Sequence, residues 1–404
     1  MLGLATLRRL AKQACNVGCR SGLQPALRVG CVKTNMPTER NGNPRASAPV
    51  PSDDSAPQLL EQLVQQAETA GASDIHLHRV GELAQVCFRL DGLLTARSPV
   101  PGELADRLFG RIKFLARLKT YQESLPQDGR IDRAVVGARN DIRVSTYPTV
   151  TGEKIVLRLF QSGGVRPLGD LGLPEAGVQK LQEFLRLGCG LLLLSGPAGS
   201  GKTTTIHGCL AAMATDGSRH IITVEDPVEQ IVPGVMQTEV NEARGLTFAQ
   251  AARHLLRQDP QVLVIGEIRD EETAAVAVRA ALTGHLTIST LHAGSCPGVW
   301  ERFRVLCPDP SSALSALELI WNQRLVRRLC AQCQGTGCEA CLQSGFSGRV
   351  PLAEWCRLDD ALRRRVPPEG AGVLQPVLSM EHAAQALLSR AVTRPTELER
   401  VFTR

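Results

Sequence analysis

Apolar and polar residues in the first half of the chain follow patterns that predict a small domain containing both helices and strands. Residues 58–71 repeat apolar positions at helical spacing and predict a helix, whereas residues 86–94 alternate as in a strand and contain a turn at Asp91-Gly92. Further segments predict a basic amphipathic helix at 107–119 and three short strands at 127–131, 140–149 and 153–160. We therefore expect an α+β domain over residues 56–162.

Strands and helices alternate in the second half of the chain. Segments that read as strands lie at 191–194, 219–229, 262–270 and 286–294, the first and third of them buried, and helical segments lie at 247–258 and 270–284. Such alternation predicts an α/β domain with a parallel sheet and helices on both of its faces. We assign this domain to residues 163–404. Ligands of such sheets bind beyond the carboxyl ends of the strands, where polar residues follow these apolar runs.

Residues 1–55 differ in composition from the rest of the chain. Residues 1–45 hold eight Lys and Arg and one Glu, whereas the remainder holds 38 basic and 39 acidic residues. An amphipathic, Arg-rich start over residues 1–35 resembles a mitochondrial transit peptide, which would place the protein in the mitochondrial matrix. We favour two other interpretations: a basic, disordered tail, or a start codon placed upstream of a true beginning at Met36.

A glycine-rich turn separates the strand at 191–194 from a helix-forming run, and it contains the pattern G-x-x-x-x-G-K-[ST]. Its residues are Gly196, Pro197, Ala198, Gly199, Ser200, Gly201, Lys202, Thr203 and the following Thr204. The glycines allow backbone N–H groups to point at a phosphate chain, the lysine reaches the β- and γ-phosphates, and the hydroxyl of Thr203 can hold Mg²⁺. We therefore expect a P-loop that binds a nucleoside triphosphate with Mg²⁺.

Acidic residues end the two strands that follow the P-loop. Glu267 follows an apolar run, where a carboxylate can hold Mg²⁺ through its water shell. Glu225 is our candidate for the carboxylate that polarises the attacking water, with Asp226 in reserve because an Asp before Pro is also a common turn former. His292 could contact the γ-phosphate, although a lone histidine can equally be structural.

Four cysteines form a compact cluster within residues 329–350. Cys330, Cys333, Cys338 and Cys341 make two C-x-x-C pairs separated by four residues. Four thiolates at this spacing can surround a tetrahedral Zn²⁺ and leave no open coordination position, so we expect a structural zinc site. A redox pair would explain one C-x-x-C but not two.

Length, charge and hydropathy exclude several other classes of protein. At 404 residues two or three domains are expected, and no apolar run is long enough to span a bilayer. A nucleotide-binding domain of this fold class could belong to a motor that moves along DNA, which we keep as an alternative function. The nearly neutral charge of residues 46–404 and the lack of a basic and aromatic stripe argue against it, so we expect no nucleic acid partner.

Several strings of residues together resemble the type II secretion and type IV pilus assembly ATPases. They are ASDIH, FRLDG, LPQDGRI, DIRVSTYPTVTGEKIVLRLF, the P-loop, ITVEDPVE, RQDP, VLVIGEIRD, TGHLTISTLHAGS and TELERVF, and the resemblance covers about residues 57–404. It implies a PAS-like domain before a RecA-like ATPase domain, with a zinc-binding knuckle towards the C-terminus. It also implies a homohexamer at the cytoplasmic side of the inner membrane, peripherally attached, that acts on a membrane platform protein.

The resemblance also assigns roles to individual residues. Glu225 matches the catalytic carboxylate, Glu267 the Walker B acid and His292 part of the γ-phosphate site. Arg143 and Arg158 match charge-stabilising arginines, although their spacing alone reads as two solvent-exposed strand residues. The cysteine pairs match the zinc motif, which the retraction ATPases lack, and thus indicate assembly or secretion. The short loop between the pairs departs from the family, as does the lack of a further N-terminal docking domain.

Overall fold

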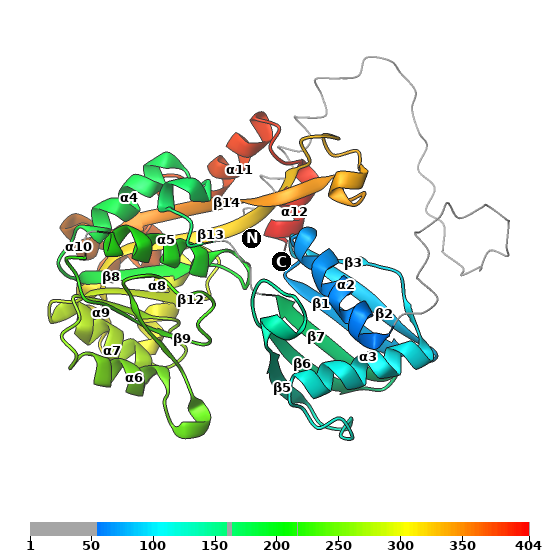
Figure 1. The fold of residues 1–404 in the computed structure, drawn as a ribbon. Coiled ribbons are helices and arrows are strands. Elements are labelled where there is room, and N and C mark those ends of the chain that lie inside the picture. Colours follow the sequence, from blue (N-terminus) through cyan, green and yellow to red (C-terminus); the bar gives the residue numbers. More distant parts are fainter. Residues whose placement is uncertain (1–54, 160–163, 216, 404) are drawn as a thin grey trace, which may run out of the picture.

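A computed structural model describes residues 55–159, 164–215 and 217–403 (Figure 1). The residues considered above as a leader or tail therefore lie outside the described part of the chain. Two seven-stranded sheets form the described structure, one from each half of the sequence. No helix in the described ranges is both long and apolar enough to cross a membrane.

The first sheet is antiparallel and has the strand order β3-β2-β1-β7-β6-β5, with β4 paired to β2. Its strands are β1 (Asp74–Val80), β2 (Leu83–Leu90), β3 (Leu93–Ala96), β4 (Val100–Pro101), β5 (Gln127–Ile131), β6 (Ile142–Thr149) and β7 (Gly152–Leu159). The helices α2 (Ala56–Thr69) and α3 (Gly102–Leu115) pack together over one face (Figure 1). This face is apolar because alternate strand residues, such as Ile75 and Leu77, are fully buried in a core shared with the helices.

The second sheet has the order β10-β9-β11-β12-β8-β13-β14, and its first six strands run parallel. Its bounds are β8 (Gly190–Ser195), β9 (Ile221–Glu225), β10 (Met236–Glu239), β11 (Val262–Ile265), β12 (Leu286–Leu291), β13 (Leu317–Leu329) and β14 (Phe346–Arg357). Strand β8 lies inside the sheet and is buried on both faces, which explains its unbroken run of leucines.

Helices cover both faces of this second sheet. Their bounds are α4 (Glu175–Leu185), α5 (Lys202–Ala214), α6 (Phe248–Leu255), α7 (Glu271–Leu282), α8 (Cys296–Leu306), α9 (Pro310–Ala316), α10 (Asp360–Glu369), α11 (Met380–Ser389) and α12 (Pro395–Phe402). Leu192 and Leu194 of β8 join a core with α4 and α5, whereas Leu191 and Leu193 join a core with α6 to α9. Each of these fully buried leucines contributes about 2 kcal/mol. The prediction of an α/β domain with helices on both faces is confirmed.

The short 3-10 helices of the described ranges lie in connections. They are η1 (Arg133–Val135), η2 (Leu168–Leu171), η3 (Glu242–Arg244), η4 (Glu339–Cys341) and η5 (Ala371–Val373).

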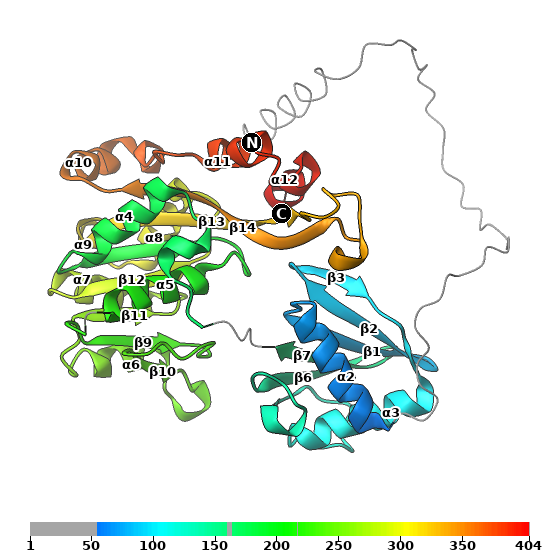
Figure 2. The ribbon, with the colours of Figure 1, turned by 45° about the horizontal axis from the view of Figure 1, so that its top comes forward.

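A long two-stranded ribbon, β13 with β14, departs from the sequence-based expectation of a purely parallel sheet. The two strands are antiparallel to each other, and β13 also pairs in parallel with β8. The four-cysteine segment forms the turn of the ribbon, and α11 and α12 pack against it (Figure 2). The ribbon therefore connects the cysteine cluster directly to the strand that leads into the P-loop.

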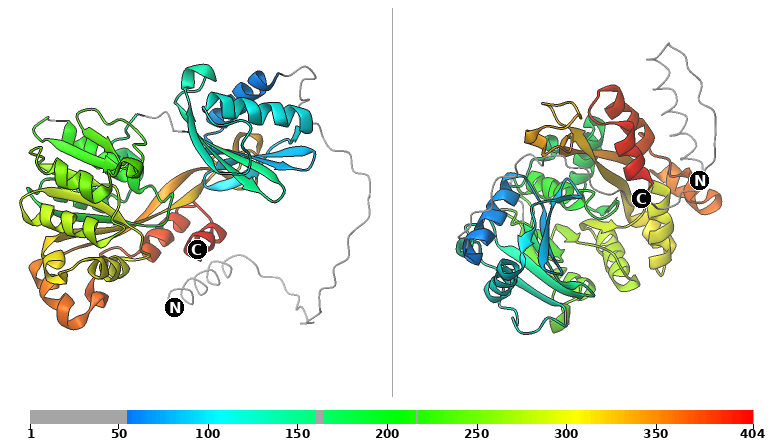
Figure 3. Two further views of the ribbon diagram at one scale, coloured as in Figure 1. Left: turned by 90° about the horizontal axis from the view of Figure 1, so that it is seen from below. Right: turned by 90° about the vertical axis from the view of Figure 1, so that its right-hand side faces the viewer.

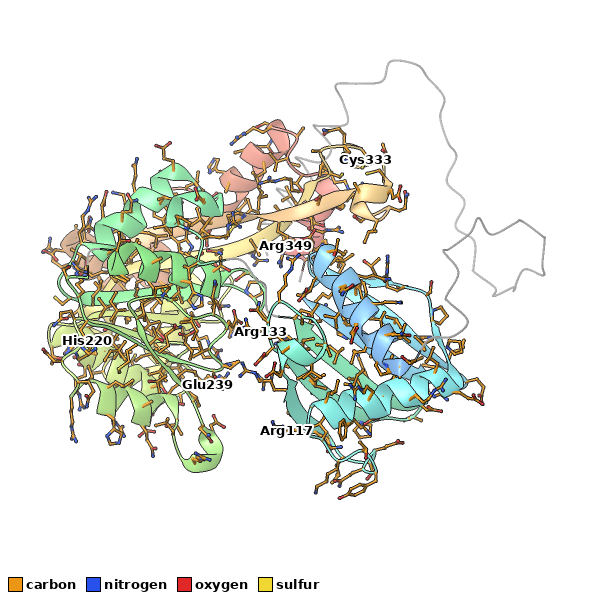
Figure 4. The ribbon with its side chains drawn as sticks, in the orientation of Figure 1. Arg117, Arg133, His220, Glu239, Cys333 and Arg349 are labelled. Carbon is orange, nitrogen blue, oxygen red and sulfur yellow. The ribbon has the colours of Figure 1, made fainter. Side chains whose placement is uncertain are left out.

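The two sheets belong to bodies that lie side by side, and the far end of the ribbon extends from one towards the other (Figure 3). Contact is made at the β2–β3 turn. Asp91 accepts a hydrogen bond of 2.9 Å from the backbone N–H of Gly348, and its other oxygen lies 3.5 Å from Nε of Arg349. Arg349 lies on the part of the ribbon nearest the small sheet (Figure 4). This pairing joins the turn at Asp91-Gly92 to the base of the cysteine-bearing loop.

Candidate functional site

Four adjacent parallel strands, β9, β11, β12 and β8, end at one edge of the second sheet. The P-loop follows β8, Glu225 ends β9, Glu267 lies just after β11 and His292 just after β12. Because the carboxyl ends of parallel strands meet at one edge, residues distant in sequence come together there.

The P-loop backbone passes close to the ribbon, and glycine is required where it does so. A Cβ atom on Gly196 would lie 2.2 Å from the carbonyl oxygen of Gln323, and Gly196 has a φ of 143°. Gly201 has a φ of 87°, and a Cβ there would lie 2.9 Å from Nε2 of Gln323. Both positions therefore exclude a side chain by conformation and by space.

The start of α5 has the features of a phosphate-binding site. The first helical acceptor, the carbonyl of Gly201, bonds the N–H of Thr205, so the preceding N–H groups of Lys202, Thr203 and Thr204 have no acceptor within the helix. The hydroxyl of Ser200 is buried and has no hydrogen-bond partner among the described residues. Unused donors at a helix N-terminus fit the phosphates of a nucleotide.

Lys202, Glu267 and His292 converge beside this turn. Nζ of Lys202 donates to the carbonyl of Gly196 at 2.9 Å, and Nδ1 of His292 lies 3.1 Å from the same oxygen. Nε2 of His292 is 3.5 Å from Glu267. Burial lowers the pKa of Lys202, and the negative charge of Glu267 opposes that shift. The histidine thus links the P-loop to the acid after β11.

Glu225 is buried and its two carboxylate oxygens are both engaged. One oxygen accepts hydrogen bonds from Thr223 at 2.7 Å and Gln237 at 2.8 Å, and the other lies 3.4 Å from Nε2 of His207 on α5. Burial raises the pKa of Glu225, but hydrogen bonds from His207, Gln237 and Thr223 outweigh burial, so the net pKa is below the ordinary value. This carboxyl is held in its ionised form.

Arg269 brings a cation to the same edge. It pairs with Glu267 and lies 3.7 Å from Asp226. These contacts raise the pKa of Arg269, first through its hydrogen bond with Glu267. The sequence interpretation found no arginine in the second half that served this edge, so Arg269 was missed. Its position two residues after Glu267 was the signal available.

Gln323 of β13 forms hydrogen bonds with both the P-loop and the start of α5. Its Nε2 donates to the carbonyl of Ser200 at 2.8 Å, while its Oε1 accepts from Thr205 at 2.9 Å and from the indole N–H of Trp321 at 3.0 Å. These contacts are buried, so the loop and the start of α5 have a fixed support.

An open cleft of about 1390 Å³ borders the P-loop on the side of the small sheet. Its lining residues include Gly201, Thr204, Arg97, Arg166 and Cys341. The cleft therefore adjoins the P-loop, but its lining does not include Lys202 or the acidic residues and histidine at the strand ends.

Arg143 and Arg158 lie on the small sheet, on β6 and β7, where they are directly opposite cross-strand partners. Nε of Arg158 lies 3.0 Å from Asp74, and the side chain of Arg158 is 64% exposed. Loss of hydration raises the pKa of Glu229, which follows β9, although the charges of His207 and Arg158 oppose that shift. Arg158 therefore lies within electrostatic reach of the acidic segment of the other body.

The four cysteine sulfurs form a compact cluster at the turn of the ribbon, where Figure 4 labels Cys333. All four lie within 4.8 Å of one another, and sulfur–sulfur distances are 3.8, 3.7 and 3.6 Å for the pairs 330–338, 333–341 and 338–341. A tetrahedral zinc with Zn–S bonds of about 2.3 Å requires sulfurs about 3.8 Å apart.

Backbone N–H groups point at these sulfurs. Gly337 donates to Cys333, and both Cys338 and Gly345 donate to Cys341, each at 3.3 Å. Burial raises the pKa of Cys341, but hydrogen bonds from Cys338 and Gly345 lower it by more, so the net pKa is about 6. Thiolates are the form that binds Zn²⁺, so the residues present fit a zinc ion.

Comparisons with known proteins agree with this geometry. The family described as "T2SSE: Type II/IV secretion system protein" matches residues 51–393. The chain belongs to this family. It is 40% identical over 352 residues to the type II secretion system protein HxcR of Pseudomonas aeruginosa, covering 84% of this chain and 75% of that protein. It is 36% identical over 346 residues to the type II secretion system ATPase E of Vibrio cholerae, covering 79% and 69% of the two chains.

The fold of this member of the secretion family is similar to that of solved ATPase structures. The pilus retraction motor PilT with bound ADP superimposes with a TM-score of 0.61 at 25% identity, covering 84% of this chain and 96% of that one. The ATPase DotB of Legionella pneumophila has a TM-score of 0.67 at 20% identity, with coverages of 88% and 96%, and bears on the fold alone. Family membership supports ATP hydrolysis in secretion or pilus assembly and implies a nucleotide with Mg²⁺.

The structure of this secretion-family chain brings together most of the residues singled out from the sequence. Lys202, Glu225, Glu267 and His292 meet at one edge of the second sheet, whereas Arg143 and Arg158 lie on the other body. The sequence interpretation missed the buried neighbours of Glu225 and the Gln323 support, because these contacts depend on strands whose pairing no local pattern reveals.

Proposed function

We propose that this chain is a Mg²⁺-dependent ATPase motor that drives assembly of a type II secretion pseudopilus or a type IV pilus. The observation that carries the proposal is the convergence of Lys202, His292 and Glu267 beside unused N–H donors at the start of α5. Family membership provides independent support.

The residues would share the work of phosphoryl transfer as follows. Backbone N–H groups from Ala198 to Thr204 hold the phosphates, Pro197 shapes the turn without donating, and Lys202 releases its contact with the carbonyl of Gly196 to reach the β- and γ-phosphates. Thr203 and Glu267 would hold Mg²⁺, which neutralises charge on the phosphates when bound. His292, which already contacts both the P-loop and Glu267, contacts the γ-phosphate.

Glu225 is assigned to orient and polarise the attacking water. The carboxylate is ionised at neutral pH, and the hydrogen bonds that lower its pKa also fix its orientation towards the water. Arg143 and Arg158 are assigned to stabilise negative charge in the transition state, since they lie side by side on a sheet near the acidic segment after β9.

The domain organisation, metal and assembly belong to the same proposal. Residues 56–162 form a PAS-like domain and residues 163–404 a RecA-like ATPase domain, with a zinc-binding subdomain over 329–350 held by the four cysteines. Six copies form a ring in the cytoplasm, peripherally bound at the inner membrane, and work on a membrane platform protein. The compact cysteine loop favours a structural role for zinc.

ATP turnover across a range of protein concentrations, with light scattering in parallel, tests this function. We expect Mg²⁺-dependent turnover that rises as a six-subunit species forms and that DNA does not change. Lys202→Ala should lose nucleotide binding and serves as the inactive control. Turnover that is independent of concentration and stimulated by DNA would instead indicate a DNA-translocating motor.

A further inference from the structure

A row of charged residues crosses the small sheet at one level. Directly opposite cross-strand partners connect Arg89 of β2, Asp74 of β1, Arg158 of β7, Arg143 of β6 and Arg130 of β5. Side chains of opposed residues in adjacent strands point to the same face of a sheet. Five neighbouring strands thus present four cations and one carboxylate in line.

The row lies on the face that α2 and α3 leave uncovered. Residues next to the row in sequence, such as Ile75, Phe88 and Leu157, are fully buried in the core with these helices. Because successive strand residues alternate between faces, the charged row points away from that core. It is therefore available to the rest of the molecule.

Asp74 is the one acid of the row and is 4% exposed. One of its oxygens lies 3.0 Å from Nε of Arg158, and the other lies 3.2 Å from Nε of Arg89 and accepts from the Ser73 hydroxyl at 2.9 Å. Each oxygen therefore fixes a different arginine.

The contact with Asp74 leaves the two terminal nitrogens of the Arg158 guanidinium free. Asp74 uses only Nε, and the two terminal nitrogens of Arg158 have no hydrogen-bond or ion-pair partner within residues 55–159, 164–215 and 217–403. Two parallel N–H groups at the end of a held guanidinium can grip two oxygens of a phosphoryl group. The charge of Arg158 already reaches Glu229 of the P-loop body.

We propose that Asp74 is a positioning residue for ATP hydrolysis, which fixes the Arg158 guanidinium so that its free edge meets the transferring phosphoryl group. The inference rests on the proposed role of Arg158. Asp74 does not touch the nucleotide. It counters the repulsion that Arg89 and Arg143 exert on Arg158 and removes the freedom of a long side chain, so the cation is in place before the transition state forms.

Steady-state kinetics of full-length Asp74→Asn tests the inference. This variant keeps the size of the side chain and loses the charge. We expect kcat to fall about 10- to 100-fold, as for a displaced catalytic group, with the KM for ATP changed less than about twofold. Asp106→Asn, which removes an exposed partner of Arg79 on the same domain, should retain wild-type kcat.

A double-mutant cycle separates positioning from general stability. Asp74→Asn added to Arg158→Ala should lower kcat no further, because the residue acts only through Arg158. An equal fall in both backgrounds, or wild-type kcat in Asp74→Asn while Arg158→Ala is impaired, would overturn the inference and leave the role of Arg158 intact. Wild-type kcat in Arg158→Ala would overturn both. Melting temperatures of all variants show whether lost folded protein explains any loss of rate.

Discussion

At the scale of single residues, the nucleotide edge is held by polar contacts that are already made before any ligand arrives. Lys202 and His292 share one backbone carbonyl as a partner, and Glu225 is held by three side chains from three elements. The groups around Glu225 are fixed in advance and need little reorganisation during the reaction, whereas Lys202 must exchange its contact with the carbonyl of Gly196 for the phosphates.

Glu225→Gln should keep ATP affinity and lose turnover. Glutamine preserves the shape of the side chain and its contacts with Thr223, but it cannot accept a proton from water. We expect kcat to fall at least about 100-fold, the contribution of a general base. Nucleotide binding measured by fluorescence with a labelled ATP analogue should remain near that of the wild type. Unimpaired turnover would exclude Glu225 as the base.

Local motifs made much of this site readable from sequence, and nonlocal pairing concealed the rest. The P-loop is a contiguous pattern, so its residues could be named directly. His207 contacts Glu225 only because α5 packs beside β9, and Arg143 faces Arg158 only through the register of β6 on β7. Register is decided by the assembled sheet, and spacing of fifteen residues does not reveal it.

At the scale of elements, the β13–β14 ribbon was not predicted although it is the longest strand pair of the described structure. Residues Leu319 to Gln323 of β13 are all buried, so the alternation that marks a half-exposed strand is missing. Asn322 and Gln323 also place polar groups in its buried part, where they bond to Glu354, Ser200 and Thr205. Elements buried on both faces lose the pattern on which strand prediction depends.

The cysteine loop at the end of this ribbon should stabilise it through zinc. Cys330→Ser removes one of four thiolates, so we expect lower zinc content by atomic absorption and a lower melting temperature, with ATP affinity retained. Cys189→Ser alters an exposed cysteine outside the cluster and should change neither quantity. Unaltered zinc content in Cys330→Ser would contradict a four-cysteine site.

Helix α12 is joined to β13 by a buried carboxylate. Glu397 contacts Arg327 and Arg400 and accepts a backbone bond from Arg327. Burial raises the pKa of Glu397, but these partners lower it from 4.5 to about 2. A carboxyl whose pKa is lower in the folded state stabilises the fold above its unfolded pKa and loses that contribution as pH falls.

Glu397→Gln should therefore destabilise the protein at neutral pH and have less effect in acid. The shift corresponds to about 3 kcal/mol above pH 4.5, lost progressively as pH falls towards 2. Chemical denaturation of wild type and variant at about pH 7 and about pH 3.5 measures the difference. Glu369→Gln, which breaks an exposed pair with Arg365, is the control and should have little effect. A difference that grows in acid would contradict the assignment.

At the scale of the whole molecule, two bodies with separate cores meet, among the described residues, through polar contacts at Asp91. Asp91 reaches both Gly348 and Arg349, and the cleft beside the P-loop lies between the same surfaces. Interfaces of this kind between domains permit relative motion.

Asp91→Ala should loosen this contact without unfolding either body. The amide of Gly348 loses its acceptor, so its hydrogen exchange should become faster, while amides in β8 keep their protection. Hydrogen exchange read by mass spectrometry measures both segments, with Asp106→Ala as a control away from the contact. Unchanged exchange at residues 346–349 would show that the pairing does not hold the bodies together in solution.

Gly177 on α4 shows how a position far from any nucleotide can govern the P-loop. A Cβ there would lie 2.7 Å from Trp321, which stacks on Trp355 at 5.4 Å between ring centroids and donates to the Gln323 that supports Ser200. The absence of a side chain at Gly177 therefore lets α4 pack against Trp321, and through Trp321 and Gln323 this packing is connected to the P-loop. Natural selection for a rigid P-loop would therefore also act on Gly177, although this glycine lies outside the P-loop.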